Sequence, residues 1–177
     1  QRCFLVKLNT SGAVIWAKSS TGHTMNPANE QATSIATDVS GNVFVTGYFD
    51  SSITFGSYYL NNTTYLGTDV FIVKYDGTGN VLWAKCSLGP GGGDHGIGVA
   101  TDASGNAYVT GVFTSVSTSF DALTLTGTTG DDNMFLVKYN SSGSAVWAKS
   151  TGTPTGDVIS TGISTDAAGN IFVTGEY

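Results

Sequence analysis

The sequence predicts an all-β fold made of repeated four-stranded antiparallel sheets. Three observations support this fold class: the chain repeats two hairpin patterns, glycine accounts for 24 of its 177 residues, and β-branched and aromatic residues dominate its short apolar runs. Glycine-rich turns between such runs favour strands, and no stretch shows the 3.6-residue periodicity of a helix. The repeats indicate the architecture, whereas function has to be inferred from the residues that do not repeat.

The first pattern is a hairpin of two strands joined by a tight turn. It reads SIATDVSGNVFVTGYF from Ser34, GVATDASGNAYVTGVF from Gly98 and GISTDAAGNIFVTGEY from Gly162. The turn begins with an aspartate, which can accept backbone N–H groups, and contains a glycine, which permits a positive φ. We expect strands over 35–38 and 43–49. A glycine near the end of the pattern recurs every 64 residues, at Gly47, Gly111 and Gly175.

The second pattern is another hairpin, with asparagine or aspartate, serine or threonine, and glycine in its turn. It reads FLVKLNTSGAVIWAK from Phe4, FIVKYDGTGNVLWAK from Phe71 and FLVKYNSSGSAVWAK from Phe135. In the middle copy the strands are predicted over 70–75 and 81–85. Each second arm carries a tryptophan, which we expect to pack between sheets rather than to stack on sugar rings. These residues are Trp16, Trp83 and Trp147.

One repeat of about 64 residues therefore holds four strands, named A to D in sequence order. Four antiparallel strands that are apolar on both faces are typical of one blade of a β-propeller, because each blade is packed between two others. The chain reads CD, ABCD, ABCD, AB, with half blades over 1–18 and 162–177 and full blades over 34–85 and 98–149. About three blades are too few for a ring of four to eight. Either further blades lie outside this segment, which we favour, or copies of it associate.

The connections fall into two sets at opposite ends of a blade. The A–B and C–D turns are short and nearly the same in every copy. The B–C connections are longer and contain an extra short hairpin, from Ile53 and again from Ser119. Because variable loops on a rigid scaffold commonly carry binding sites, we expect function at the B–C/D–A face. The D–A connections are predicted over 19–33, 86–97 and 150–161.

The two hairpin patterns resemble the bacterial β-propeller repeat family often called the seven-bladed propeller repeat, and the strand order is similar to that of NHL-type propellers. The resemblance covers nearly the whole chain through D-x-x-G-N-x-[FY]-V-T-G-x-[FY] and F-[LI]-V-K-[LY]-[ND]-x-x-G-x-x-x-W-A-K. It implies a segment of a large exported or surface-attached protein. The repeats look like those of Bacteroidetes-type exported multidomain proteins, which implies an adhesive or scaffolding role. The segment departs from the family in having too few blades.

Composition limits the partners that we expect. The net charge is −6, so nucleic acid and anionic membranes are poor candidates. Only 11% of the residues are charged, which is common in turn-rich proteins outside the cell. No apolar run approaches the roughly 20 residues that would span a bilayer. Cys3 and Cys86 lie at different repeat positions, so we expect no disulfide between them.

The residues that do not repeat are the candidates for binding. Tyr58, Tyr59 and Tyr65 lie in the first B–C insert and have no aromatic counterparts in the second, although one of the first two must fill the hairpin's own core. Asp94 and His95 follow a run of glycines, and Asp131 and Asp132 end the second insert. A solvated loop carboxylate is the plainer interpretation of each acid.

The sequence predicts no catalytic residue, no metal site and no cofactor. The repeated aspartate–glycine–asparagine turns offer too few oxygens for Ca²⁺, and the two histidines lack partners for zinc. We therefore expect a non-catalytic adhesion or scaffolding module with a protein or glycan partner, located outside the cell or on the bacterial surface. A carbohydrate-binding, lectin-like propeller is the alternative. An enzyme with a pocket at the central channel is the third hypothesis.

Overall fold

The computed structural model describes residues 2–22, 29–62, 64, 67–128, 130–150 and 156–177, which form strands and turns without a helix. Two four-stranded antiparallel sheets have the orders β3-β4-β7-β8 and β9-β10-β13-β14, and two-stranded sheets β1–β2 and β15–β16 flank them. The strands are β1 (Phe4–Leu8), β2 (Val14–Ser19), β3 (Glu30–Thr37), β4 (Val43–Phe49), β5 (Ser52–Phe55), β6 (Tyr58–Asn61), β7 (Asp69–Tyr75), β8 (Val81–Cys86), β9 (His95–Thr101), β10 (Ala107–Phe113), β11 (Ser117–Phe120), β12 (Leu123–Thr126), β13 (Asn133–Tyr139), β14 (Ala145–Ser150), β15 (Ile159–Thr165) and β16 (Ile171–Glu176).

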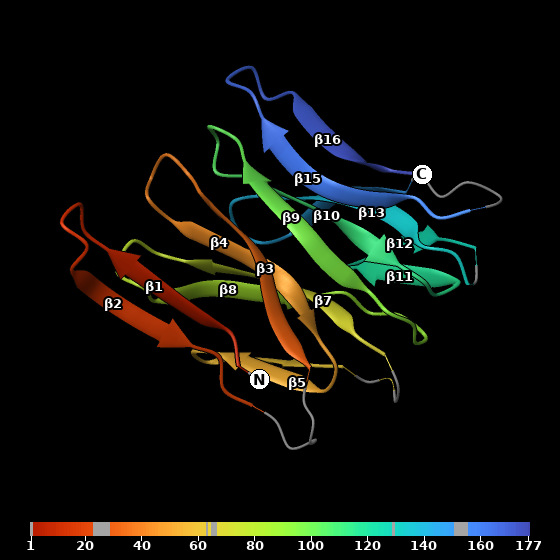
Figure 1. The fold of residues 1–177 in the computed structure, drawn as a ribbon, viewed down its shortest axis with the longest axis horizontal. Coiled ribbons are helices and arrows are strands. Elements are labelled where there is room, and N and C mark those ends of the chain that lie inside the picture. Colours follow the sequence, from red (N-terminus) through yellow and green to blue (C-terminus); the bar gives the residue numbers. More distant parts are fainter. Residues whose placement is uncertain (1, 23–28, 63, 65–66, 129, 151–155) are drawn as a thin grey trace.

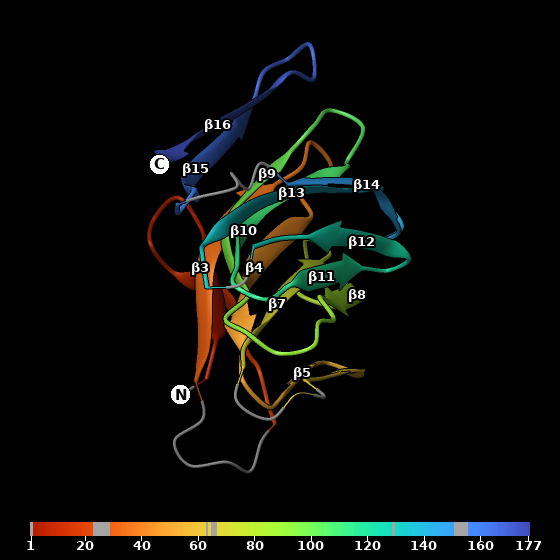
Figure 2. The same cartoon turned by 90° about the vertical axis from the view of Figure 1, so that its right-hand side faces the viewer.

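The sheets pack side by side as blades and do not close into a ring. The three A strands β3, β9 and β15 are neighbours along the middle of the molecule (Figure 1). In the view turned by 90°, β3 and β15 lie at one side, whereas β8, β14 and the small hairpins lie at the other (Figure 2). The expected all-β fold of antiparallel blades is confirmed. The predicted extra hairpins are also present, as β5–β6 and β11–β12.

The A strands begin earlier than predicted. In the first full blade β3 starts at Glu30 instead of residue 35, so the connection expected over 19–33 is shorter. The later A strands likewise start before residues 98 and 162, at His95 and Ile159. The reason is a β-bulge in each A–B pair, which lies between Ala32 and Ser34 in the first. A bulge adds one unpaired residue and so breaks the two-residue alternation by which a strand is recognised in a sequence.

The repeated glycine of the first pattern lies opposite this bulge. The backbone of strand A comes so close to it there that no side chain would fit. A Cβ atom added to Gly47 would lie 1.8 Å from the carbonyl oxygen of Gln31. At Gly111 the same atom would lie 2.0 Å from the carbonyl oxygen of His95. Only glycine leaves room for the bulged strand, which explains why the residue recurs every 64 positions.

The core consists of two layers, one on each face of the first full blade. Phe44 and Ile72 point into the layer shared with the second full blade. Val45 and Val73 point into the opposite layer, which β1 covers with Leu5. This arrangement explains why the central strands are apolar on both faces. In β13, by contrast, buried and half-buried residues alternate, because only the half blade β15–β16 packs on its outer side.

At the turn end, where the A–B and C–D turns lie, each A–B turn is capped by its aspartate. Asp38 Oδ1 accepts the backbone N–H groups of Ser40 and Asn42, at 3.0 and 2.9 Å. Its Oδ2 accepts the side-chain amide of Asn42 and lies 3.7 Å from Lys74 Nζ. Burial raises the pKa of Asp38, but these hydrogen bonds and the lysine outweigh burial and hold it below its usual value. The predicted capping role is confirmed.

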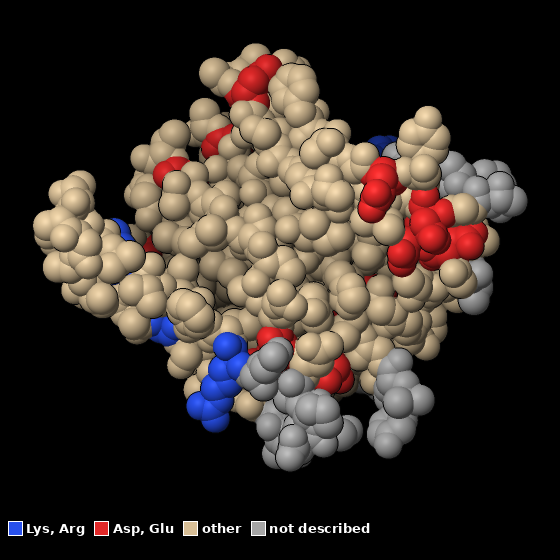
Figure 3. Space-filling view, viewed as in Figure 1, with Lys and Arg blue, Asp and Glu red and all other residues tan. Residues whose placement is uncertain are grey.

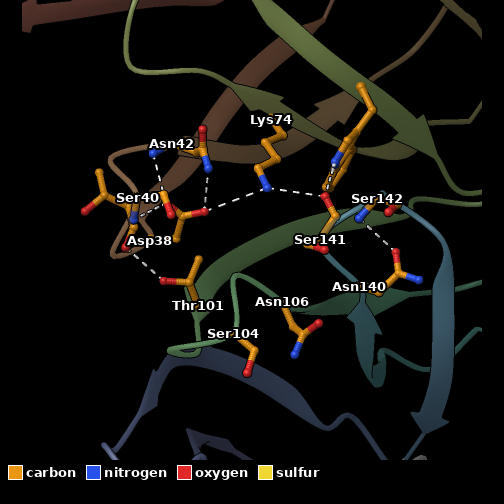
Figure 4. A network of polar contacts seen from close by, with 12 residues as sticks. Asp38, Ser40, Asn42, Lys74, Thr101, Ser104, Asn106, Asn140, Ser141 and Ser142 are labelled. Carbon is orange, nitrogen blue, oxygen red and sulfur yellow. Dashed lines mark hydrogen bonds and ion pairs between the residues drawn. The ribbon is translucent and has the colours of Figure 1, made fainter.

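A lysine and a tryptophan join each C–D hairpin to the next blade. Lys74 Nζ donates to the carbonyl of Ser141, at 3.3 Å, and Trp83 Nε1 donates to the same oxygen, at 3.1 Å (Figure 4). The ammonium also lies over the ring of Phe44, 4.9 Å from its centroid. We call this group of contacts the inter-blade latch. It recurs one blade earlier, where Lys7 and Trp16 both donate to the carbonyl of Gly77.

We expect replacement of Trp83 by phenylalanine to lower the free energy of unfolding by about 1–2 kcal/mol, because one donor to the Ser141 carbonyl and part of a buried ring are lost. Urea unfolding would measure the change. Trp147→Phe is the matched control, since within the described residues the Trp147 indole N–H has no hydrogen-bond partner and the ring is half-buried. Equal losses in the two variants would contradict the latch.

Candidate functional site

The two ends of the blades differ in how their polar groups are used. At the turn end, the same backbone bonds close every A–B turn and every C–D turn, as in Gly41 N–H to Asp38 O and Gly79 N–H to Asp76 O. At the other end, which we call the variable end, the connections 20–29, 50–68, 87–94, 114–132 and 151–158 differ between copies. Non-repeating side chains of this end form the candidate site.

An aromatic pair marks the inner rim of the variable end. The rings of Tyr48 and His95 stack with centroids 4.2 Å apart and planes at 37°. The Tyr48 hydroxyl donates to Gln31 Oε1, at 2.6 Å. Burial lowers the pKa of His95, and the nearby Asp132 carboxylate acts in the opposite direction. The imidazole is therefore mainly neutral at pH 7 and presents one N–H donor and one acceptor.

Carboxylates gather beside this pair. The backbone N–H of Asp132 donates to Asp157 Oδ1, at 2.9 Å, and the Val158 N–H donates to the carbonyl of Asp132, at 2.7 Å. Asp131 precedes Asp132 and is likewise half-buried. Figure 3 shows acidic side chains gathered at the right-hand side of the molecule, in the region of the β12–β13 and β14–β15 connections. Of the predicted residues, the structure thus brings His95 and Asp132 together, with Asp131 adjacent in the chain.

Tyr48, Gln31 and Asp157 belong to the same surface, although the sequence analysis did not select them. Tyr48 pairs with Gln31 across the A–B strands, in the place that His95 and Val112 occupy in the next blade. A signal for this position was present in the sequence. The residue after the repeated V-T-G changes from tyrosine to valine to glutamate, at Tyr48, Val112 and Glu176, while the residues around it stay nearly constant.

The tyrosines of the first insert have different environments. Tyr58 packs against both core layers and its hydroxyl donates to the carbonyl of Leu82, at 2.6 Å, so it is the residue that fills the hairpin core. Tyr59 is exposed, and its hydroxyl lies 3.2 Å from Asn61 Oδ1. Tyr65 lies outside the described residues. Only Tyr59 is therefore presented by the described part of the insert as an accessible ring.

Asp94 is part of a buried structural network. Its side chain is 3% exposed, and Oδ2 accepts the hydroxyls of Thr118, at 2.7 Å, and Ser87, at 3.5 Å. The Ser87 hydroxyl in turn accepts the N–H of Val70, which links the end of strand D to strand C. Glu30 occupies the equivalent position one blade earlier and accepts the hydroxyl of Ser20. Asp94 is consequently inaccessible to a large partner.

A second buried acid lies at the start of strand C. Asp69 is 4% exposed, and burial, together with the Asp94 carboxylate, raises its pKa to about 7. Burial also raises the pKa of Asp94 to about 6. The repeat equivalent of Asp69 is Asn133, whose amide donates to the carbonyls of Phe113, Thr128 and Asp131. Burial and the Asp94 carboxylate therefore both favour the protonated form of Asp69.

A hollow of about 370 Å³ lies on the outer side, between the half blade β1–β2 and the first full blade. Its lining includes Lys18, Gly56 and Val81. One blade further on, Asp121 stands in place of Gly56 and binds Lys85 Nζ at 3.0 Å and the N–H of Ala145 at 2.8 Å. The hollow is thus the space that a carboxylate occupies in the next copy.

The described residues were also searched for groups of metal ligands and for reactive thiols. Within them, no three side chains of histidine, cysteine, aspartate or glutamate are grouped as metal ligands. Both cysteines are free, and burial raises the pKa of Cys3 to about 11 and that of Cys86 to about 12. These thiols are therefore protonated and unreactive near neutral pH. The described chain also contains no helix long and apolar enough to cross a membrane.

Comparison with known proteins agrees with the blade architecture. A family model described as SBBP, beta-propeller repeat, matches residues 146–176, which hold strand D of the second full blade and the last A–B hairpin. Over these residues the chain is similar to a β-propeller repeat, in agreement with the antiparallel blades of the fold. Propeller repeats commonly serve as non-enzymatic protein-interaction modules.

Two proteins that are similar to this chain are longer than it. An uncharacterized WD repeat-containing protein of Acanthamoeba polyphaga mimivirus is 26% identical over 202 aligned positions, which cover 96% of this chain and 14% of that protein. The solved structure of a protein of unknown function from Bacteroides caccae superposes with a TM-score of 0.49 and 12% identity, covering 98% of this chain and 50% of that one. The chain thus spans about a seventh of the first and half of the second.

We expect Asp69→Asn to stabilise the propeller repeats at pH 8 by up to about 4 kcal/mol, the free energy equivalent of a pKa raised from 3.8 to about 7. Because the folded-state pKa is the higher one, the stabilising contribution of the protonated acid is complete below about pH 4 and is lost as the pH rises through 7. Urea unfolding at pH 5 and pH 8 would measure the difference between the two proteins at each pH.

The matched control is Asp76→Asn in an exposed turn, where hydrogen bonds from Thr78 and Asn80 hold the pKa of the acid below its usual value. This variant should gain no stability at pH 8. A wild-type protein whose stability does not fall between pH 5 and 8 relative to Asp69→Asn would contradict the buried, protonated state of Asp69.

Proposed function

We propose that this segment is a non-catalytic interaction module of an exported bacterial protein, with an adhesive or scaffolding role, and that it binds its partner through the variable end. The observation that supports this proposal is the unequal use of polar groups at the two ends. Side chains of the turn end, such as Asp38, Lys74 and Trp83, are bonded within and between blades. The non-repeating groups at the variable end, His95 and Asp132 among them, remain half-exposed.

The proposed partner is a protein surface or segment rich in lysine and arginine. Asp131, Asp132 and Asp157 lie at this end, and residues 86–137 contain no lysine or arginine. A negative potential at this end would steer a basic partner and disfavour an acidic one. The stacked rings of Tyr48 and His95 would supply apolar contact area next to the charges.

A glycan partner is the second candidate, favoured by the same stacked pair. Carboxylates such as Asp132 can accept sugar hydroxyls, and the exposed ring of Tyr59 lies on the outer part of the same end. A low content of charged side chains and a turn-rich architecture support a location outside the cell or on the bacterial surface. Both partners use binding without covalent chemistry, so the proposed role needs no cofactor.

We expect the double substitution Asp131→Asn/Asp132→Asn to weaken binding to Lys/Arg-rich peptides on an array at least tenfold, because two carboxylates that face the partner lose their charge. The labelled 177-residue protein would be probed at low and at physiological ionic strength, where screening should reduce binding by the wild type as well.

Asp76→Asn and Asp166→Asn together form the control, because they remove two charges from the turn end and asparagine caps such turns at Asn9 and Asn140. A glycan array probed in parallel would separate the two candidates. Equal weakening by both double variants, or binding to glycans alone, would overturn the basic protein partner.

A further inference from the structure

The second insert hairpin places a carboxylate between two outer strands. Asp121, in the turn between β11 and β12, accepts a hydrogen bond from Lys85 Nζ at 3.0 Å and one from the backbone N–H of Ala145 at 2.8 Å. Burial alone would raise the pKa of Asp121, but these contacts hold it below its usual value. Because Lys85 belongs to β8 and Ala145 begins β14, the carboxylate links the D strands of neighbouring blades.

The first insert hairpin has the same turn without the carboxylate. Gly56 stands at the position of Asp121, and the two residues have nearly equal positive φ values, 57° and 51°. Asp121 is the only residue other than glycine with a positive φ in the described chain. Since the backbone of the turn is alike in both copies, the difference between them lies in the side chain.

The groups that bind the carboxylate in the second copy are also present in the first. Lys18 holds the repeat position of Lys85, Val81 holds that of Ala145, and both line the hollow of about 370 Å³. Val81 and Ala145 each begin an outer strand, whose N–H groups that point away from strand C have no partner in the sheet. Among the described residues, Lys18 forms no ion pair.

A buried tyrosine adds a further polar group to this wall. Tyr75 lines the hollow and is 4% exposed, and within the described part of the chain its hydroxyl has no hydrogen-bond partner. Burial raises the pKa of its equivalent Tyr139, and the Asp121 carboxylate adds to this effect, so that phenol lies near the carboxylate. Other hydroxyl and amide groups of the lining belong to Thr21, Ser57 and Asn80.

The exchange of two side chains leaves the charge of this site unmatched. The first copy has Gly56 and Val81 where the second has aspartate and alanine. A Cβ atom added to Gly56 would lie 3.2 Å from Val81 Cγ2, so the valine takes up part of the space of the aspartate. No described residue replaces the negative charge. Both contacts of the aspartate come from D strands, which are present on both sides of the hollow as β2 and β8.

We propose that this hollow binds the carboxylate of a small hydroxylated acid, such as a hexuronate, through Lys18 Nζ and the Val81 N–H. Its volume of about 370 Å³ lies within the range of roughly 300–1,000 Å³ that small-molecule sites commonly have. The hydroxyl and amide groups of the lining would bind the hydroxyl groups of the ligand. The site lies on the outer side of the blades and goes beyond the proposed contact of the variable end with a partner.

NMR titration of the ¹⁵N-labelled 177-residue protein with glucuronate at millimolar concentrations would test the site. The amide signal of Val81 should shift and saturate with glucuronate and should not respond to glucose, which lacks the carboxylate. Acetate and N-acetyl-aspartate amide carry the carboxylate without the ring hydroxyls and should bind more weakly. An equal response to glucose, or no saturable shift at Val81, would overturn the proposal. Equal affinity for N-acetyl-aspartate amide would overturn the hydroxylated ligand.

Lys18→Gln should raise the dissociation constant for glucuronate by about tenfold or more, because a charged hydrogen bond to the carboxylate is lost. Lys149→Gln is the matched control, since it makes the same charge change at the same repeat position on β14 and should leave binding unchanged. The dispersion of the amide signals reports whether each variant is folded. Equal weakening by the two variants would contradict a specific role of Lys18.

The second copy supplies the sharpest variants. Gly56→Asp/Val81→Ala reproduces its residues and should abolish glucuronate binding, because the chain then fills the hollow with its own carboxylate. Val81→Ala alone should keep the site. Conversely, Asp121→Gly should open an equivalent site, detected by a glucuronate-dependent shift of the Ala145 amide. Undiminished binding by Gly56→Asp/Val81→Ala, or no second site in Asp121→Gly, would overturn the assignment.

Discussion

The inter-blade latch is the interaction on which the rest of the structure depends. A lysine on strand C and a tryptophan on strand D reach the same carbonyl in the C–D turn of the next blade. The lysine is almost fully buried, so its charge needs compensation, and the A–B turn of its own blade supplies a carboxylate for this. The same side chains thus form bonds between strands of one blade and bonds to the next blade.

The latch also decides which end of the blades is available for other contacts. Turn residues that hold neighbouring blades together vary little between copies, because each one meets equivalent atoms of the next repeat. At the variable end, only some of the polar side chains hold strands or blades together. Ser20 with Glu30 and Ser87 with Asp94 repeat a link between strand ends, whereas the positions of Tyr48, His95 and Asp132 hold other residue types in the other copies.

Much of the architecture could be predicted from the sequence, because equal stretches of chain fold into equal sheets. The strand over Val43–Phe49, the extra hairpins and the aspartate-capped turns are all present. The early start of the A strands could not be predicted, since the bulge after Ala32 interrupts the alternating pattern. For the site, His95, Asp131 and Asp132 could be selected from the sequence because they do not repeat. The burial of Asp94 could not be predicted, because an acid beside a run of glycines has the pattern of a solvated loop.

The sequence by itself determined the strand order and the type of the blades in this segment, because these depend on local turn chemistry and on strands that are apolar on both faces. Only the tertiary structure decided which polar side chains form contacts with neighbouring blades. Asp94 raises the pKa of Asp69, which precedes it by 25 residues in the sequence, only because the fold brings the two acids close together. Tyr48 meets His95 for the same reason, since contacts between repeats depend on the packing of one sheet against another.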